Sequence, residues 1–128
     1  MADEMTTHFT VWNHKGSVLF AHSEPQSQVA GGFAAKAYYK NLAHVEQLAA
    51  EAGGQFLAGE DVTIADCVAM ATFQFADIFH GVPIPSSAPM LAGWYSRFSN
   101  RPSAEGCAYP QSILNVSRGL LEQCPAAT

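Results

Sequence analysis

The segment FLAGEDVTIADC, residues 56–67, constrains the fold most, because it joins a loop to a complete helix-start signal. Within it, the hydroxyl of Thr63 can accept the backbone N–H three residues on, while the carboxylate of Asp66 can accept the N–H of Thr63. Such a capping box satisfies two N–H groups that a helix start leaves unpaired, and losing it costs about 1 kcal/mol. We therefore predict a helix that starts after Thr63, and we interpret Thr63 and Asp66 as a structural capping box rather than an active-site pair.

Two further helices are predicted before this segment. Apolar residues recur at three- and four-residue steps from about residue 7 to 22, and again from 34 to 52. Turn and breaker residues at 23–27 and 31–32 separate the two helices, although a helical turn continuing between these breakers stays open. The glycine pair at 53–54 supplies a stop for the second helix, in the left-handed conformation that glycine adopts easily.

Two helices are also predicted after the capping box. The first, from 64 to about 79, is apolar on nearly every side, which is typical of a buried helix. Proline and glycine residues then break the chain, and Pro89 suits the first turn of the second helix. The apolar stripe of that second helix consists of Met90 or Leu91, Trp94, Tyr95 and Phe98.

The remaining pattern fixes the expected fold class. Short helices are expected after Pro102 and near 112–122, and no strand-like alternation bounded by turns occurs along the chain. We therefore predict an all-α fold, a helical bundle of four to six helices around one central buried helix. The length of 128 residues fits one compact domain that spans residues 1–128.

The composition argues against several classes of partner. Hydrophobic residues make up 48% of the chain and charged residues only 13%, which is too apolar for a disordered protein. No apolar run reaches the ~18 residues that a membrane span requires. The formal net charge is -5 without a basic cluster, so the charge pattern attracts neither nucleic acid nor an acidic membrane surface. We therefore expect a soluble protein that binds neither nucleic acid nor membranes.

Cysteines and histidines give no sign of catalysis or metal binding. The three cysteines are widely spaced and no signal segment follows Met1, so we expect a reducing, cytoplasmic location. Cys67 falls inside the helix opened by the capping box, where we expect a small buried thiol. No two of the five histidines stand four residues apart, and no phosphate-binding loop or nucleophile elbow occurs. We therefore predict no metal, no cofactor and no catalytic residue.

Residues 56–67 closely resemble the loop and helix start of the C-terminal, all-helical domain of glutathione transferases. The family pattern there is roughly F-[IL]-A-G-D-x-x-[ST]-[IL]-A-D, and the chain departs from it once, with Glu60 in place of the usual Asp. Further along, LAGWYSRFSNRPS at 91–103 is similar to that domain's helix with an L-x-x-W-Y-x-x-[FV] stripe and an R-P-[SA] ending. The resemblance covers about residues 36–103, with a loose match at Val11-Trp12-Asn13 before it.

The resemblance implies one half of an active site. In full-length members, a preceding thioredoxin-like domain binds glutathione and carries the Tyr, Ser or Cys that interacts with its thiol. The helical domain forms much of the pocket for the electrophilic co-substrate. No strand–helix–strand pattern precedes the first helix here. Because a free thiol is only a few per cent ionised at neutral pH, we expect the chain alone to be nearly inactive, with glutathione as a co-substrate only beside a thioredoxin-like domain.

The first predicted helix carries the binding residues that the resemblance implies. The matching helix of the family borders the co-substrate pocket and part of the dimer interface, which implies substrate contacts for His8, Phe9, Trp12 and Asn13. In a full-length transferase, the thioredoxin-like domain or a second subunit would cover the aromatic residues of this helix. We therefore expect a homodimer joined through this helix, the alternative being a helix repacked onto the bundle.

Three functional interpretations follow from the resemblance. The first is a glutathione-transferase-like domain that binds a small hydrophobic ligand and is a truncated product or is completed by a separate thioredoxin-like chain. The second is a non-enzymatic module that assembles with other proteins, as transferase-like domains do in some translation-factor and synthetase complexes. The third is a fragment whose activity lies in residues outside this sequence.

Overall fold

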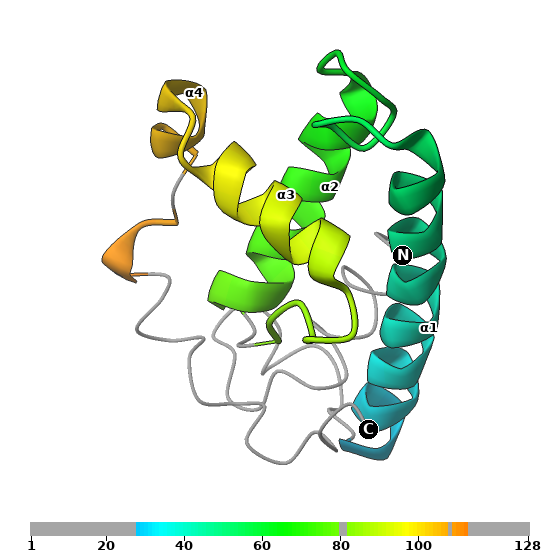
Figure 1. Ribbon diagram of the computed structural model, residues 1–128. Coiled ribbons are helices and arrows are strands. Elements are labelled where there is room, and N and C mark those ends of the chain that lie inside the picture. Colours follow the sequence, from blue (N-terminus) through cyan, green and yellow to red (C-terminus); the bar gives the residue numbers. More distant parts are fainter. Residues whose placement is uncertain (1–27, 80–81, 108, 113–128) are drawn as a thin grey trace.

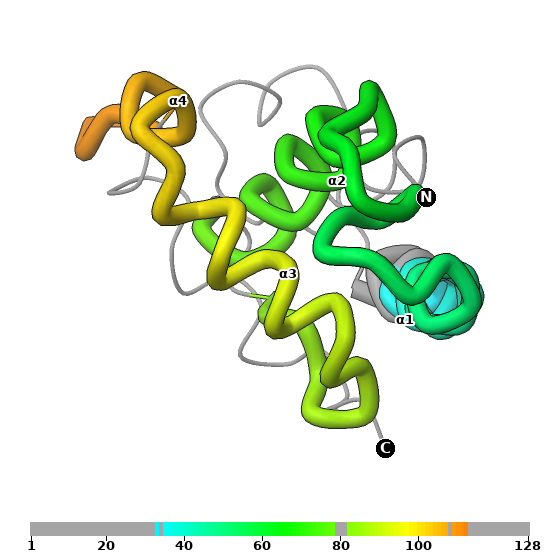
Figure 2. The backbone as a smooth tube through the Cα atoms, turned by 45° about the horizontal axis from the view of Figure 1, so that its top comes forward, coloured from blue at the N-terminus to red at the C-terminus, as the bar shows by residue number. Residues whose placement is uncertain are grey.

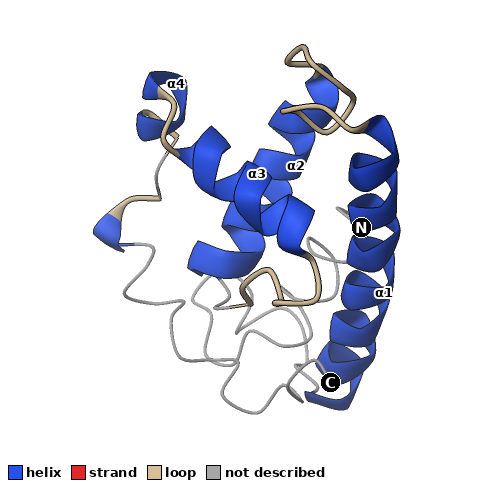
Figure 3. Cartoon of the chain, in the orientation of Figure 1, coloured by secondary structure: helices blue, strands red, loops and turns tan. Residues whose placement is uncertain are grey.

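The regular structure of the described residues is helical. The computed structural model describes residues 28–79, 82–107 and 109–112, and these ranges contain no strand (Figure 3). The predicted all-α class is confirmed. The elements are α1 (Gln28–Ala52), α2 (Ile64–Gln74), a π-helical turn directly after α2 (Phe75–Phe79), α3 (Pro89–Ser99) and α4 (Pro102–Glu105).

The four helices meet at α3. α1 stands along one side of the molecule, α2 and α3 cross at its centre, and α4 lies on the side away from α1 (Figure 1). A view nearly along the axis of α1 shows α3 lying against α2 (Figure 2). α3 contacts α1, α2 and α4, which makes it the common neighbour of the other helices. The helix predicted at 7–22 and nearly all of the one predicted near 112–122 lie outside the described residues.

α1 is longer than its apolar pattern predicts. It begins at Gln28 and runs through Gly31 and Gly32, so the helical turn between the two breaker segments is continuous with the rest of the helix. Gly53 follows the helix with a φ of 69°, in the left-handed region, which confirms the predicted stop. The buried residues of α1 are Ala35, Tyr38, Leu42 and Ala49.

The loop between α1 and α2 closes tightly on itself. Phe56 and Gly59 exchange two backbone hydrogen bonds, with N···O distances of 2.9 and 3.3 Å. A Cβ atom at Gly54 would overlap the backbone of Gly59, so only glycine fits at that position. The closed loop brings the N–H of Leu57 to 3.1 Å from Oδ1 of Asp66.

α2 begins at a reciprocal cap. Thr63 has an extended backbone, with φ -127° and ψ 175°, and its Oγ1 accepts the N–H of Ala65 at 3.2 Å. In return, Oδ2 of Asp66 accepts the N–H of Thr63 at 2.9 Å. Both side chains therefore satisfy backbone N–H groups at the helix start, which is a structural task.

α2 is buried along one side only, which corrects the prediction of a helix buried all round. Ile64 is 81% exposed and Val68 is 54% exposed, and both lie on the side of α2 that faces away from the core. Apolar residues occupy both sides of this helix, so its composition alone did not distinguish the covered side from the open one. The buried residues of α2 are Asp66, Ala69, Met70, Thr72, Phe73 and Gln74.

α3 begins without a cap from its own sequence neighbours. Pro89 stands in its first turn as predicted, but the preceding Ala88 has no side-chain acceptor to offer. Glu46 of α1 takes that role instead: its Oε1 accepts the N–H of Met90 at 2.9 Å, and its Oε2 accepts the N–H of Leu91 at 2.8 Å. Leu91 is buried and Met90 is exposed, which settles the alternative in the predicted stripe.

Aromatic rings fill the space between α2 and α3. The ring centroid of the fully buried Phe73 lies 5.9 Å from that of Trp94 and 6.3 Å from that of Tyr95, both in edge-to-face geometry. Trp94 stacks on Phe98 at 5.4 Å. Such pairs add about 0.5–1.5 kcal/mol to the burial of their area. This cluster fixes the two helices against each other and leaves the outer side of α2 free to form a surface groove.

Candidate ligand-binding groove

A groove of about 280 Å³ lies beside the outer side of α2, between this helix and the segment that includes α4. Its walls are mainly apolar, and its volume is just below the range of about 300–1,000 Å³ that is typical of small-molecule sites. It therefore has room for a small apolar molecule. The lining residues are Val62, Cys67, Met70, Ala71, Gln74, Phe98, Arg101, Ser103, Ala104 and Cys107.

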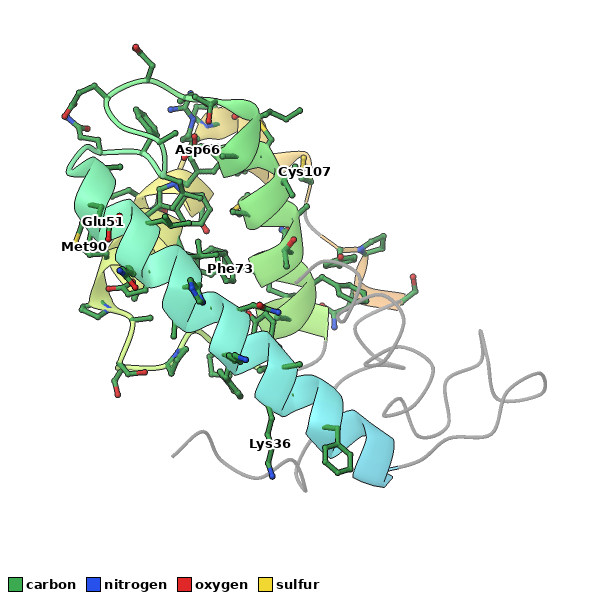
Figure 4. The ribbon with its side chains drawn as sticks, turned by 90° about the vertical axis from the view of Figure 1, so that its right-hand side faces the viewer. Lys36, Glu51, Asp66, Phe73, Met90 and Cys107 are labelled. Carbon is green, nitrogen blue, oxygen red and sulfur yellow. The ribbon has the colours of Figure 1, made fainter. Side chains whose placement is uncertain are left out.

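Two free thiols line this groove. The prediction of a buried thiol at Cys67 is wrong: the residue is exposed and lines the groove from α2. Asp66 precedes it and points into the core, and the 100° step between helical neighbours turns Cys67 outward. Cys107, beside α2 in Figure 4, comes from the segment after α4, and its Sγ–H donates to the carbonyl oxygen of Ser103 at 3.6 Å.

Arg101 and Phe98 form the end of the groove where α3 meets α4. The guanidinium of Arg101 lies over the ring of Phe98, 5.3 Å from its centroid, and over the ring of Phe56 at 5.9 Å. Cation–π contacts of this kind contribute about 0.5–1 kcal/mol at exposed sites. The stacking holds the Arg101 head in one place although its residue is exposed.

Asp66 lies in the core, where a ligand in the groove cannot reach it. Its carboxylate is completely buried and accepts four hydrogen bonds: from the N–H groups of Leu57 and Thr63, from the hydroxyl of Thr63 at 3.3 Å, and from Nε1 of Trp94 at 2.8 Å. These bonds use its acceptor capacity. Burial alone would raise the pKa of the Asp66 carboxyl, but the donated hydrogen bonds outweigh burial and lower that pKa. The residue stays ionised and structural.

A second polar cluster lies at the far end of α2. Burial and the carboxylate of Asp77, which accepts a hydrogen bond from Tyr95, raise the pKa of Tyr95 to about 12. Burial, with smaller contributions from Tyr39 and Asp77, also raises the pKa of Tyr38 well above its usual value. Both phenols therefore remain protonated at neutral pH, so neither serves as a base toward a thiol.

The described residues contain neither a membrane-spanning helix nor a cluster of metal ligands. In residues 28–79, 82–107 and 109–112, no helix combines the length and the apolar character that a bilayer crossing needs. The same ranges hold no group of three or more His, Cys, Asp or Glu side chains that could bind a metal ion.

The structure does not describe the binding residues that were predicted on the first helix. His8, Phe9, Trp12 and Asn13 all lie outside the described residues. Sequence reasoning also missed the groove, because its walls come from the end of the loop before α2, from α2, from the end of α3 and from the segment 101–107, which only the folded chain brings together. The exposed thiol at Cys67 carried no local signal that separated it from a buried one.

Comparison with known families agrees with this helical architecture. Residues 18–102 of the 128 match the family model described as glutathione S-transferase, C-terminal domain. No curated protein and no solved structure gives a significant match to the chain. The family match spans α1, α2 and α3 and reaches the first residue of α4. The chain therefore belongs to the family of glutathione S-transferase C-terminal domains.

Proposed function

We propose that this domain supplies the apolar co-substrate pocket of a glutathione-transferase-like protein, and that the groove beside α2 is that pocket. The observation that carries the proposal is the groove itself: about 280 Å³ of mainly apolar space within a chain that belongs to this family. Apolar walls with a few polar groups at the ends are typical of sites that take small hydrophobic molecules. The proposed ligand is a neutral apolar compound.

The chain alone is proposed to be nearly inactive toward glutathione and electrophiles. Conjugation at neutral pH needs a group that stabilises the thiolate of glutathione, because the free thiol has a pKa near 8.5. Tyr38 and Asp66 are enclosed in the core, and the hydroxyl of Tyr95 is hydrogen-bonded to Asp77, so none of these groups is placed to stabilise a bound thiolate. We propose that a thioredoxin-like domain, on a separate chain or in the same protein, provides that group in the cytoplasm.

Filling the groove tests the proposed pocket. A neutral apolar fluorophore such as N-phenyl-1-naphthylamine is titrated into the wild-type chain and into Ala71→Trp, which places an indole in the groove. Ala65→Trp is the matched control, because Ala65 is also an exposed alanine of α2 but does not line the groove. We expect at least tenfold weaker binding for Ala71→Trp and unchanged binding for Ala65→Trp. Equal affinities in all three proteins would contradict the proposal.

Glutathione titration tests the missing half of the site. We expect no binding tighter than about 1 mM by calorimetry with the isolated chain, and conjugation of an electrophile at the background rate. Adding a thioredoxin-like domain that binds glutathione is expected to raise the conjugation rate. A chain that conjugates glutathione unaided would show that it carries an activating group of its own.

The first predicted helix is proposed to complete the pocket and to join two copies of the chain. His8, Phe9, Trp12 and Asn13 are the proposed contacts with the co-substrate, and the aromatic residues of this helix are the proposed dimer contacts. Light scattering of the wild type and of Trp12→Ala tests the dimer. We expect twice the monomer mass for the wild type and a lower mass for the variant at equal concentration. A monomeric wild type would remove this part of the proposal.

The second candidate function is a protein assembly module without enzymatic activity. The supporting observation is the exposed apolar side of α2, where Ile64 and Val68 face outward next to the groove. Exposed apolar patches often mark protein interfaces. A Val68→Asp variant distinguishes the candidates: it is expected to abolish a complex with a protein partner, whereas binding of the neutral fluorophore in the groove persists because Val68 does not line it.

A further inference from the structure

A second cavity, of about 200 Å³, opens beside the C-terminal half of α3 and the loop before α2. Its chemistry differs from that of the groove, because two guanidinium groups stand among aromatic rings. We refer to it as the arginine pocket. Its lining residues are Gln55, Phe56, Trp94, Arg97, Phe98 and Arg101.

Both arginine heads of this pocket are held in place. Nη2 of Arg97 donates to the carbonyl oxygen of Gln55 at 3.1 Å. The Arg101 guanidinium stacks on the rings of Phe56 and Phe98, with centroid distances of 5.9 and 5.3 Å. Arg97 stands in the last turn of α3 and Arg101 directly before α4, and both side chains line this cavity. The ordering of these long side chains is thus part of the fold and need not accompany binding.

A glycine inside α3 makes room for one of these heads. A Cβ atom at Gly93 would stand only 3.3 Å from Nη1 of Arg97, one helical turn further along. Glycine in a helix interior stabilises the helix less than alanine does. Gly93 therefore lowers the stability of α3 at the position that the Arg97 guanidinium lies against. The missing side chain therefore lets the Arg97 head lie back along α3.

The positive charge of the arginine pocket is not neutralised within the described part of the chain. Among the described residues, the two guanidinium groups contact a carbonyl oxygen and two aromatic rings, and no carboxylate pairs with either of them. The whole chain has six basic residues and a net charge of -5, so two fixed arginines around one cavity are a local exception. Toward the described residues, most donors of the two guanidinium groups remain open to a ligand.

We infer that the arginine pocket binds a small aromatic carboxylate. The carboxylate accepts hydrogen bonds from Arg97 and Arg101, since guanidinium groups match the geometry of its two oxygens. The ring packs against the half-buried side chain of Phe56, which lines the same cavity. The volume of about 200 Å³ suits a ligand with one ring. This inference goes beyond the proposed function, because the groove beside α2 would take a neutral molecule.

Benzoate is the probe, and benzamide is its neutral control of the same shape. Binding is followed by NMR through the Nε1–H signal of Trp94 and the amide signals of Gln55 and Phe56, at low ionic strength because salt screens the exposed charges. We expect a dissociation constant of about 1 mM for benzoate, as is usual for a ligand of so few atoms, and at least tenfold weaker binding of benzamide. Equal affinities of the two probes would overturn the inference.

Charge variants separate the pocket from general electrostatics. Arg97→Gln is expected to weaken benzoate binding about tenfold, and Arg97→Lys by less, since lysine keeps the charge but loses the planar fork. Lys36→Gln is the matched control: it also removes one positive charge, but Lys36 points away from the other helices near the start of α1 (Figure 4). An equal loss in Lys36→Gln and Arg97→Gln would contradict a specific site.

Two further variants, Gly93→Ala and Ala71→Trp, test the position of the binding site without changing any charge. Gly93→Ala displaces the Arg97 head and is expected to weaken benzoate binding two- to threefold while the melting temperature stays the same or rises. Ala71→Trp fills the groove beside α2. Phe98 and Arg101 line both cavities, but Ala71 lines the groove and Arg97 lines the arginine pocket, so benzoate affinity is expected to stay unchanged. Loss of benzoate binding in Ala71→Trp would place the ligand in the groove and overturn the inference.

Discussion

α2 and α3 are of equal length in the structure, yet their N-termini are capped in opposite ways. α2 is capped by Thr63 and Asp66, which stand three residues apart, whereas α3 is capped by Glu46 of α1, 44 residues before Met90. The first cap forms within a single turn of chain, and the second exists only when α1 and α3 are packed together. The difference shows that the same physical need, acceptors for unpaired N–H groups, can be met locally or by the tertiary fold.

The two caps also differ in what else depends on them. Asp66 accepts bonds from the loop through Leu57 and from α3 through Trp94, in addition to its cap. Glu46 is half-buried, and within the described part of the chain its carboxylate bonds to the first turn of α3 alone. The local cap is therefore the more connected of the two, and removing it is expected to cost more.

The largest effect is expected for Asp66→Asn. The substitution keeps the shape but removes a buried charge and one acceptor oxygen, which leaves donors from Leu57, Thr63 and Trp94 competing for one carbonyl. We expect a loss of about 3 kcal/mol in the free energy of unfolding, measured by urea denaturation. Asp61→Asn is the control, since Asp61 is exposed in the same loop and its change is expected to stay within about 0.5 kcal/mol. Equal losses would contradict the central role of Asp66.

Glu46→Ala tests the remote cap. It removes the acceptors of two N–H groups at the start of α3, so we expect a loss of about 1.5–2 kcal/mol in the free energy of unfolding. Glu51→Ala serves as the control because Glu51 is an exposed residue of the same helix that accepts a bond from the exposed Gln47 and caps no other helix among the described residues. A Glu46→Ala chain as stable as Glu51→Ala would mean that α3 needs no cap from α1.

Thr63→Ala tests the contribution of the Thr63 hydroxyl to the local cap of α2. The variant loses the acceptor for the N–H of Ala65 but keeps every bond of the carboxylate except the one from the Thr63 hydroxyl. We expect a loss of about 1 kcal/mol, measured by the same denaturation. Thr63→Ser, which retains the hydroxyl, is expected to recover most of this stability. Failure of serine to recover it would indicate that the methyl group of Thr63, and not its oxygen, is what matters.

The smallest effect concerns pH. The pKa of Asp66 is lowered in the folded chain, so its contribution is fully present above the unfolded value of about 3.9 and is lost as pH falls further. We expect the melting temperature of the wild type to fall more steeply below about pH 4 than that of Asp66→Asn, whose side chain does not titrate. Scanning calorimetry between pH 5 and 2.5 measures both slopes. If the melting temperatures of both proteins fall equally with pH, other carboxyl groups determine the loss of stability in acid.

The comparison explains how much of the fold the sequence predicts. The all-α class, the stop at Gly53, the proline in the first turn of α3 and the short helix after Pro102 follow from local residue chemistry. The bonds from Trp94 to Asp66 and from α3 to Glu46 span 28 and 44 or 45 residues, and no motif announces them. Local signals predict local hydrogen bonds, and packing decides the rest.

The candidate sites were harder to predict than the helices. Apolar residues on every side of a helix predict a buried helix, whereas the structure leaves Ile64, Cys67 and Val68 exposed. Which side a helix covers depends on its neighbours, and those are set by crossing angles that composition does not encode. The arginine pocket was likewise hidden, because Gln55 and Arg97 stand 42 residues apart in sequence.

The bond between Glu46 and α3 also bears on the order in which the chain folds. The turn that starts α2 can form as soon as Thr63 and Asp66 meet, since only a three-residue loop has to close. The start of α3 must wait until the chain between residues 46 and 90 has collapsed, at a larger cost in loop entropy. We expect Thr63→Ala to slow folding and Glu46→Ala mainly to speed unfolding. The bond from Glu46 to α3 would then form after the folding transition state and keep the packed helices from separating.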